Sequence, residues 1–87
     1  MPYIKAVKRP ALDRVIDPLI AELATTSVDD RDGSMNYVVT RLLHALYPTN
    51  YFNLNRAVGV VECVKLELYR RIAAPYEDKK IVENGDV

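Results

Sequence analysis

The chain has 87 residues, and its 12 lysine and arginine residues balance its 12 aspartate and glutamate residues. This length suits one domain with a modest core, and the zero formal charge argues against a dedicated nucleic-acid binder, which is usually basic. A single cysteine, Cys63, and a single histidine, His44, exclude an intrachain disulfide and a four-ligand zinc knuckle, so self-association is the remaining way to stabilise so small a chain.

The first predicted helix runs from Pro10 to about Ala24. Pro10 suits a first helical position, whereas Pro18 lies in the interior, where proline removes a hydrogen bond and clashes with the preceding turn. The helix either kinks at Pro18 or restarts there with Asp17 as its cap. A kink is favoured, because one apolar stripe continues through the proline, formed by Leu12, Val15, Ile16, Leu19, Ile20 and Leu23.

The second predicted helix extends from Asp32, as its cap, to about Tyr47, and Pro48 stops it. Ser27 and Asp30 resemble a capping pair, so a turn of helix could begin earlier. The apolar face of this helix consists of Met35, Val38, Val39, Leu42, Leu43 and Leu46.

The third predicted helix begins after Asn53, as its cap, and continues to about Ala74. Phe52 and Ala57 occupy the two positions of a hydrophobic staple. The spacing of apolar residues predicts a core stripe made of Leu54, Ala57, Val58, Val61, Val64, Leu68 and Ile72.

A weaker patch lies nearly opposite this stripe and consists of Gly59, Cys63 and Leu66. A helix that is apolar on two sides is usually covered on two sides. Gly59 and Cys63 are small and four residues apart, so they would let another backbone approach closely. Either the first helix or the C-terminal tail covers this patch, or a second subunit does.

Pro75 is expected to end or kink the third helix. A short further helix is predicted between Tyr76 and Asn84, with Gly85 as its C-terminal stop. The predicted fold is therefore all-α: a compact bundle of three main helices plus a short C-terminal helix, forming a single domain over residues 1–87.

The polar residues of the helices give only weak indications of a catalytic or metal-binding site. Lys65 lies on or beside the core stripe, where it either has a depressed pKa or ligates an anion, or, as favoured, extends its amine to the surface beside Glu62. Glu62 and Glu67 are five residues apart and point in different directions, so surface ion pairs, such as Glu67 with Arg71, explain them better than a metal site does. His44 has no matching nucleophile.

Basic pairs are the remaining candidates for a binding site. Arg70, Arg71, Lys79 and Lys80 could bind nucleic acid, and Tyr76 could stack on a base. Acidic residues interleave with these cations, so a solvated surface is favoured.

Three segments of the sequence are distinctive together. They are Met1-Pro2-Tyr3-Ile4-Lys5, Asn36-Tyr37-Val38-Val39-Thr40-Arg41-Leu42, and the C-terminal signature, which runs from Tyr69-Arg70-Arg71 through Pro75-Tyr76-Glu77-Asp78-Lys79-Lys80-Ile81 to Glu83-Asn84-Gly85-Asp86-Val87. In these segments the chain resembles a small family of uncharacterised prokaryotic and phage proteins. The resemblance implies a whole protein but no activity, ligand or catalytic residue. The C-terminal signature either binds a partner or folds back to pair with Arg41 or Arg56.

The favoured function is a non-enzymatic protein-interaction or assembly module, with a homodimer as the expected state. Alternatives are a phage-related nucleic-acid-associated accessory protein and a metal-dependent nucleotide hydrolase.

No catalytic residue, metal ligand or cofactor is predicted. A membrane-spanning helix is not expected, and a lone cysteine without an export signal fits the cytoplasm. The predicted binding residues are Gly59, Cys63, Leu66, Arg70, Arg71, Tyr76, Lys79 and Lys80.

Overall fold

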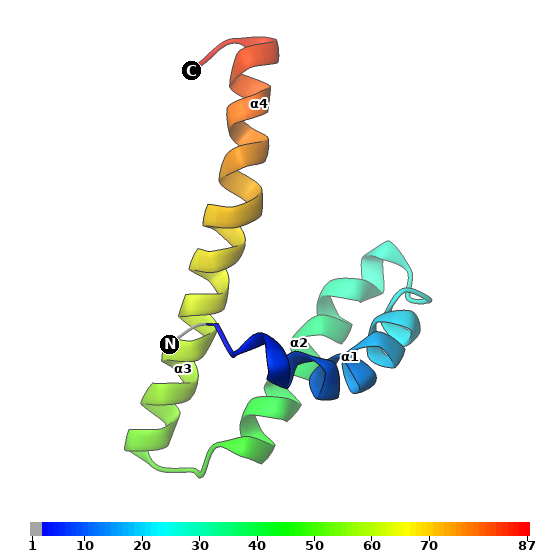
Figure 1. The fold of residues 1–87 in the computed structure, drawn as a ribbon, viewed down its shortest axis with the longest axis vertical. Helices are drawn as coiled ribbons and strands as arrows, with labels where there is room; N and C mark the ends of the chain where they lie inside the picture. Colours follow the sequence, from blue (N-terminus) through cyan, green and yellow to red (C-terminus); the bar gives the residue numbers. More distant parts are fainter. Residues whose placement is uncertain (1–2) are drawn as a thin grey trace. The chain divides into compact units, whose positions relative to one another are not determined.

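A computed structural model describes residues 3–87, which form helices joined by short loops, with no strand in this range (Figure 1). The predicted all-α class is therefore confirmed. Met1 and Pro2, the start of the predicted N-terminal motif, lie outside the described residues. The chain divides into an N-terminal unit that ends at Tyr47 and a C-terminal unit, Pro48–Val87. How the predicted bundle packs stays a prediction, and each unit is described by itself.

The N-terminal unit is a pair of helices preceded by a short 3-10 turn. The elements are η1 (Ala6–Lys8), α1 (Arg9–Leu23) and α2 (Val28–Leu46). Pro10 lies in the first turn of α1, as predicted, and α1 continues through Pro18 without a second start. The alternative of a restart capped by Asp17 is therefore wrong, whereas the kink stays a prediction.

The connection between α1 and α2 is held by side chains that bond to the backbone. The hydroxyl groups of Thr25 and Thr26 donate to the carbonyl oxygens of Glu22 and Leu23 at 2.7 and 2.6 Å. Arg31 donates to the Thr26 carbonyl oxygen at 2.9 Å, so a residue of α2 closes the loop from the other side. The two hydroxyl bonds reinforce the backbone N–H bonds that Thr25 and Thr26 donate to the same carbonyl oxygens at the end of α1.

The start of α2 follows the early alternative, not the one with Asp32 as its cap. The Ser27 hydroxyl accepts from the Asp30 backbone N–H at 3.3 Å and donates to the Asp30 carboxylate at 3.0 Å. This capping pair starts the helix at Val28, because it satisfies a free N–H of the first turn and places acidic groups at the positive helix end.

The start of α3 (Tyr51–Leu68) corrects the predicted cap. Asn50, not Asn53, caps this helix: its side-chain oxygen accepts from the Asn53 backbone N–H at 2.9 Å and from the Asn53 amide nitrogen at 3.0 Å. The staple predicted between Phe52 and Ala57 depended on a cap at Asn53 and is therefore wrong, since both residues lie inside the helix.

The C-terminal unit contains one continuous helical stretch rather than a main helix and a separate short one. It is 34 residues long and consists of α3, the five-residue π segment η2 (Tyr69–Ala73) and α4 (Ala74–Asn84). Figure 1 shows the ribbon passing from α3 into α4 without a break. The predicted end at Pro75 is wrong, whereas the predicted kink there stays a prediction.

The π segment explains how the helix passes this proline. The Ala74 N–H bonds to the carbonyl oxygen of Tyr69, five residues back. A proline ring clashes with the carbonyl group four residues back and has no N–H to donate. A wider turn directly before Pro75 relieves this conflict locally. The helix ends where predicted: Gly85 adopts φ 87° and donates its N–H to Ile81 at 2.8 Å.

The Asn50 cap can be tested by substituting the residue. Asn50→Ala should lower the free energy of unfolding by about 1 kcal/mol, since it removes the acceptor for the Asn53 N–H, whereas Asn50→Asp should retain most of the stability. Urea denaturation followed by circular dichroism, at one protein concentration, measures both. A larger loss with Asn53→Ala than with Asn50→Ala would restore Asn53 as the cap.

Candidate functional site

Apolar side chains are exposed along one side of the C-terminal helix. The members are between 39% and 70% exposed, although the sequence predicted them as core. We call them the exposed stripe: Leu54, Val58, Val61, Val64, Leu68 and Ile72. Of the predicted core stripe only Ala57 is buried. A single helix has no second element in its unit to cover this side, which is why helical periodicity alone predicted a core that the unit does not form.

Lys65 lies within this apolar surface and behaves as the favoured interpretation expected. Its ammonium nitrogen is 3.0 Å from the Glu62 carboxylate, and its side chain is 69% exposed. The predicted extension of Lys65 to the surface beside Glu62 is therefore confirmed. Within the C-terminal unit no other element covers the amine, which is paired at the surface of its own helix.

The predicted patch of Gly59, Cys63 and Leu66 lies on another side of α3. Cys63 is a half-buried free thiol, whereas Gly59 and Leu66 are exposed. A Cβ placed on Gly59 would have no neighbour within 4 Å. Within the C-terminal unit nothing makes the close approach that these small residues were predicted to permit, and cover by the first helix or by a second subunit stays a prediction.

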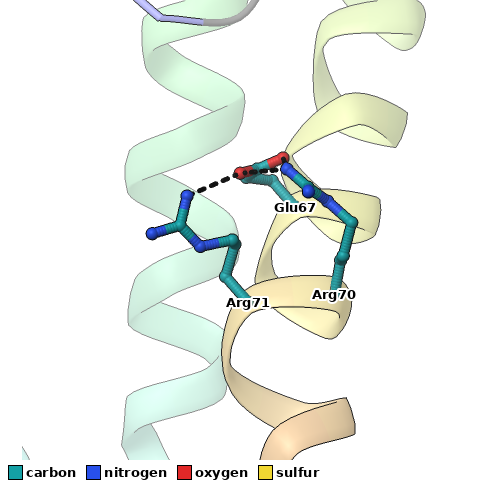
Figure 2. A network of polar contacts seen from close by, with 3 residues as sticks. All are labelled: Glu67, Arg70 and Arg71. Atoms are coloured by element: carbon teal, nitrogen blue, oxygen red, sulfur yellow. Dashed lines mark hydrogen bonds and ion pairs between the residues drawn. The ribbon is translucent and has the colours of Figure 1, made fainter.

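Glu67 forms the main polar cluster of the C-terminal unit (Figure 2). Both of its carboxylate oxygens accept from Nη2 of Arg70 at 3.0 Å, and Nη1 of Arg71 lies 3.7 Å from one of them. The predicted pair of Glu67 with Arg71 is confirmed, and Arg70 is a partner that sequence spacing did not identify. Two arginines therefore share one half-buried carboxylate.

A second contact crosses the π segment. The Tyr69 hydroxyl hydrogen-bonds to Glu77, and this bond, with the charge of Glu77, raises the pKa of Tyr69 above 10.0. Slight desolvation and the charge of Asp78 act in the same direction. Residues before and after Pro75 are thereby joined. Sequence spacing did not indicate this bond, because the two residues are eight positions apart, farther than the three or four positions over which helix side chains usually pair.

The remaining signature residues are on the surface of α4. The Lys80 amine is 3.1 Å from the Glu83 carboxylate and 5.5 Å from the centre of the Tyr76 ring. Lys79 is exposed. Three of the four predicted cations, Arg70, Arg71 and Lys80, therefore already face carboxylates, and a nucleic acid would have to displace those contacts. Pairing of the signature with Arg41 or Arg56 stays a prediction.

The N-terminal unit contributes an open groove beside the turn between α1 and α2. Among the side chains that line it are Leu19, Glu22, Asp29, Asp30 and Tyr37. None of the predicted binding residues is in this groove. Within residues 3–87, no three histidine, cysteine, aspartate or glutamate side chains gather as a group that could hold a metal ion. His44 is exposed on α2.

Comparisons with known proteins give a family and no activity. The family model described as Domain of unknown function (DUF6899) matches residues 1–87. No curated protein and no solved structure matches the chain. Over the residues that the structure describes, no helix has both the length and the apolar character needed to cross a membrane.

The contact between Tyr69 and Glu77 predicts a measurable titration. Glu77→Gln should lower the pKa of Tyr69 towards 10.0, since it removes the charge that disfavours tyrosinate. Because the folded pKa is raised, the associated stability is complete below pH 10 and is lost as the pH rises through the raised pKa. Tyrosinate absorbance, taken as the difference from Tyr69→Phe, reports the shift. An unchanged Tyr69 titration in Glu77→Gln would contradict the contact.

Proposed function

Since the chain belongs to the family described as Domain of unknown function (DUF6899), we propose from its surfaces that it is a non-enzymatic assembly module that forms a homodimer. The surface that we assign to this dimer is the exposed stripe of the C-terminal helix. The single observation that carries the proposal is that this unit consists of one helix whose apolar side has no cover of its own.

The size of the stripe supports a stable contact. Burying one large apolar side chain completely contributes about 1.5–3 kcal/mol. For six side chains that are about half exposed, the gain is roughly 5–10 kcal/mol for each copy. Two copies together gain about twice that amount, which is comparable with or greater than the roughly 4–15 kcal/mol that association costs. A dimer along this surface is therefore energetically reasonable.

The spacing of the stripe favours a second helix of the same kind as its partner. Two sets of residues recur every seven positions: the leucine series, Leu54, Val61 and Leu68, and the lysine series, Val58, Lys65 and Ile72. The two series lie side by side along α3, up to Leu68, and Ile72 follows in the π segment. A repeat of seven keeps one apolar side of a helix in contact with a partner helix along its length. A second copy supplies the same repeat.

The alternatives have less support. Three of the four cations predicted to bind nucleic acid already contact Glu67 or Glu83. A hydrolase would need a cluster of metal ligands, and Glu62 instead pairs with Lys65. Both arrangements favour contact through apolar surface over contact through charge.

Charge placed in the stripe should separate the copies. Val61→Glu and Leu68→Glu should each raise the dissociation constant about 100-fold or more, because an unpaired carboxylate would be buried between two helices. Leu66→Glu is the matched control on the opposite side, and it should change the constant by less than about threefold. Sedimentation equilibrium measures the constants, and circular dichroism confirms that the helices persist.

Two results would contradict this proposal. The full chain could sediment as a monomer at high concentration, with slow amide exchange along the stripe, in which case another part of the same chain covers it. Alternatively, Leu66→Glu could dissociate the dimer while Val61→Glu leaves it intact. That result would place the contact on Gly59, Cys63 and Leu66, as the sequence predicted.

A further inference from the structure

The apolar surface of the C-terminal helix contains one charge, at Lys65. We infer that two copies pair along the exposed stripe in antiparallel orientation, and that Lys65 excludes the parallel alternative. This inference rests on the proposed homodimer and adds the direction of its partner. It depends on where Lys65 stands in the lysine series and on its ion pair with Glu62.

Parallel pairing would bring like charges together. In a parallel, in-register pair every residue lies opposite its own copy, so Lys65 would face Lys65 across helices whose axes are about 8–10 Å apart. Apart from Glu62, which each amine already binds, the neighbours of Lys65 are Val61, Val64 and Leu68, which carry no charge. Both ammonium groups would lose water in an apolar contact without an added counter-charge.

Antiparallel pairing removes this conflict. Suppose that the two helices run in opposite directions and that the midpoint of their contact is at the level of residue 63 along the axis. Each member of one series then lies level with a member of the other series in the second copy. Val58 then meets Leu68 of the second copy, and Lys65 meets Val61 of the second copy. Glu62 of the second copy is one residue along from that level, so each ammonium group gains a second carboxylate within reach besides the Glu62 that it already binds at 3.0 Å.

The helix dipoles favour the same direction. In each copy the positive end of the helix dipole is the N-terminus near Tyr51. Antiparallel pairing brings the positive end of one helix towards the negative end of the other. Outside the stripe, Arg70 and Arg71 already face Glu67 in their own chain, so the antiparallel alignment adds no uncompensated cation to the contact.

Disulfide trapping in the full chain determines the direction. Cys63→Ser removes the native thiol, and Val58→Cys and Leu68→Cys are each added to that background, mixed and oxidised. Antiparallel copies should give mainly the mixed link between positions 58 and 68. Parallel copies would give links from 58 to 58 and from 68 to 68, because ten residues of helix span about 15 Å, farther than a disulfide reaches. Peptide mass mapping identifies each link.

The role of Lys65 has its own test. Lys65→Ile in the same backgrounds should raise the fraction of same-position links about tenfold, since the parallel pair is no longer penalised, and Lys65→Arg should leave it unchanged. Where the added cysteines disturb pairing, spin labels on Asn55→Cys in the Cys63→Ser background give the same information. Antiparallel copies place these labels about 25 Å apart along the axis, and parallel copies place them level.

Each outcome distinguishes the two proposals. A full chain that sediments as a monomer overturns the proposed function, and this inference with it. A dimer that gives same-position links overturns the antiparallel inference and leaves the dimer standing. A dimer whose mixed link persists unchanged in Lys65→Ile overturns the role of Lys65.

Discussion

A helix cannot cover its own side chains, and this constraint governs the C-terminal half of the molecule. From Tyr51 to Asn84 the backbone hydrogen bonds are satisfied within one helical stretch, but the apolar side chains can leave water only by contact with something else. In the N-terminal unit α1 and α2 contact each other, yet most of their large apolar side chains, although predicted as core, are exposed as well. The exposed stripe is thus one of the apolar surfaces that have no cover inside their own unit.

The polar residues of the C-terminal helix are arranged for the helix itself. Its ion pairs join residues three or four positions apart: Glu62 with Lys65, Glu67 with Arg70 and Arg71, and Lys80 with Glu83. Such pairs on an exposed helix contribute little stability each. These charged groups already have partners in their own helix. A contact with another molecule therefore depends more on the apolar side chains than on these charges.

Local rules were sufficient to predict most of the helices. Apolar spacing gave all three helical stretches, Ser27 and Asp30 gave the early start of α2, and Gly85 gave the C-terminal stop. The spacing of Glu62 and Lys65 likewise indicated their ion pair. Each of these features depends on residues within about one helical turn, which is the range over which sequence spacing determines geometry.

Other features could not be predicted because two solutions satisfy the same local rule. Asn50 and Asn53 are both good caps, and the choice depends on how the loop after Pro48 enters the helix. Pro75 normally marks a helix end, but a π turn lets the backbone continue. The bond between Tyr69 and Glu77 spans that turn and joins residues too far apart in sequence for local spacing to indicate it. Periodicity also identifies an apolar side of a helix without identifying what covers it.

The π segment also limits how far one side of the helix keeps facing the same direction. Its extra residue moves the side chains beyond it roughly 100° out of phase with a regular α-helix. Pro75 is the next position in the leucine series after Leu68, and this offset turns it away from the line that the earlier members follow. The side of α3 that carries the exposed stripe therefore does not continue in a straight line along α4. A molecule that contacts α4 would approach the helix from a different direction than one that contacts α3.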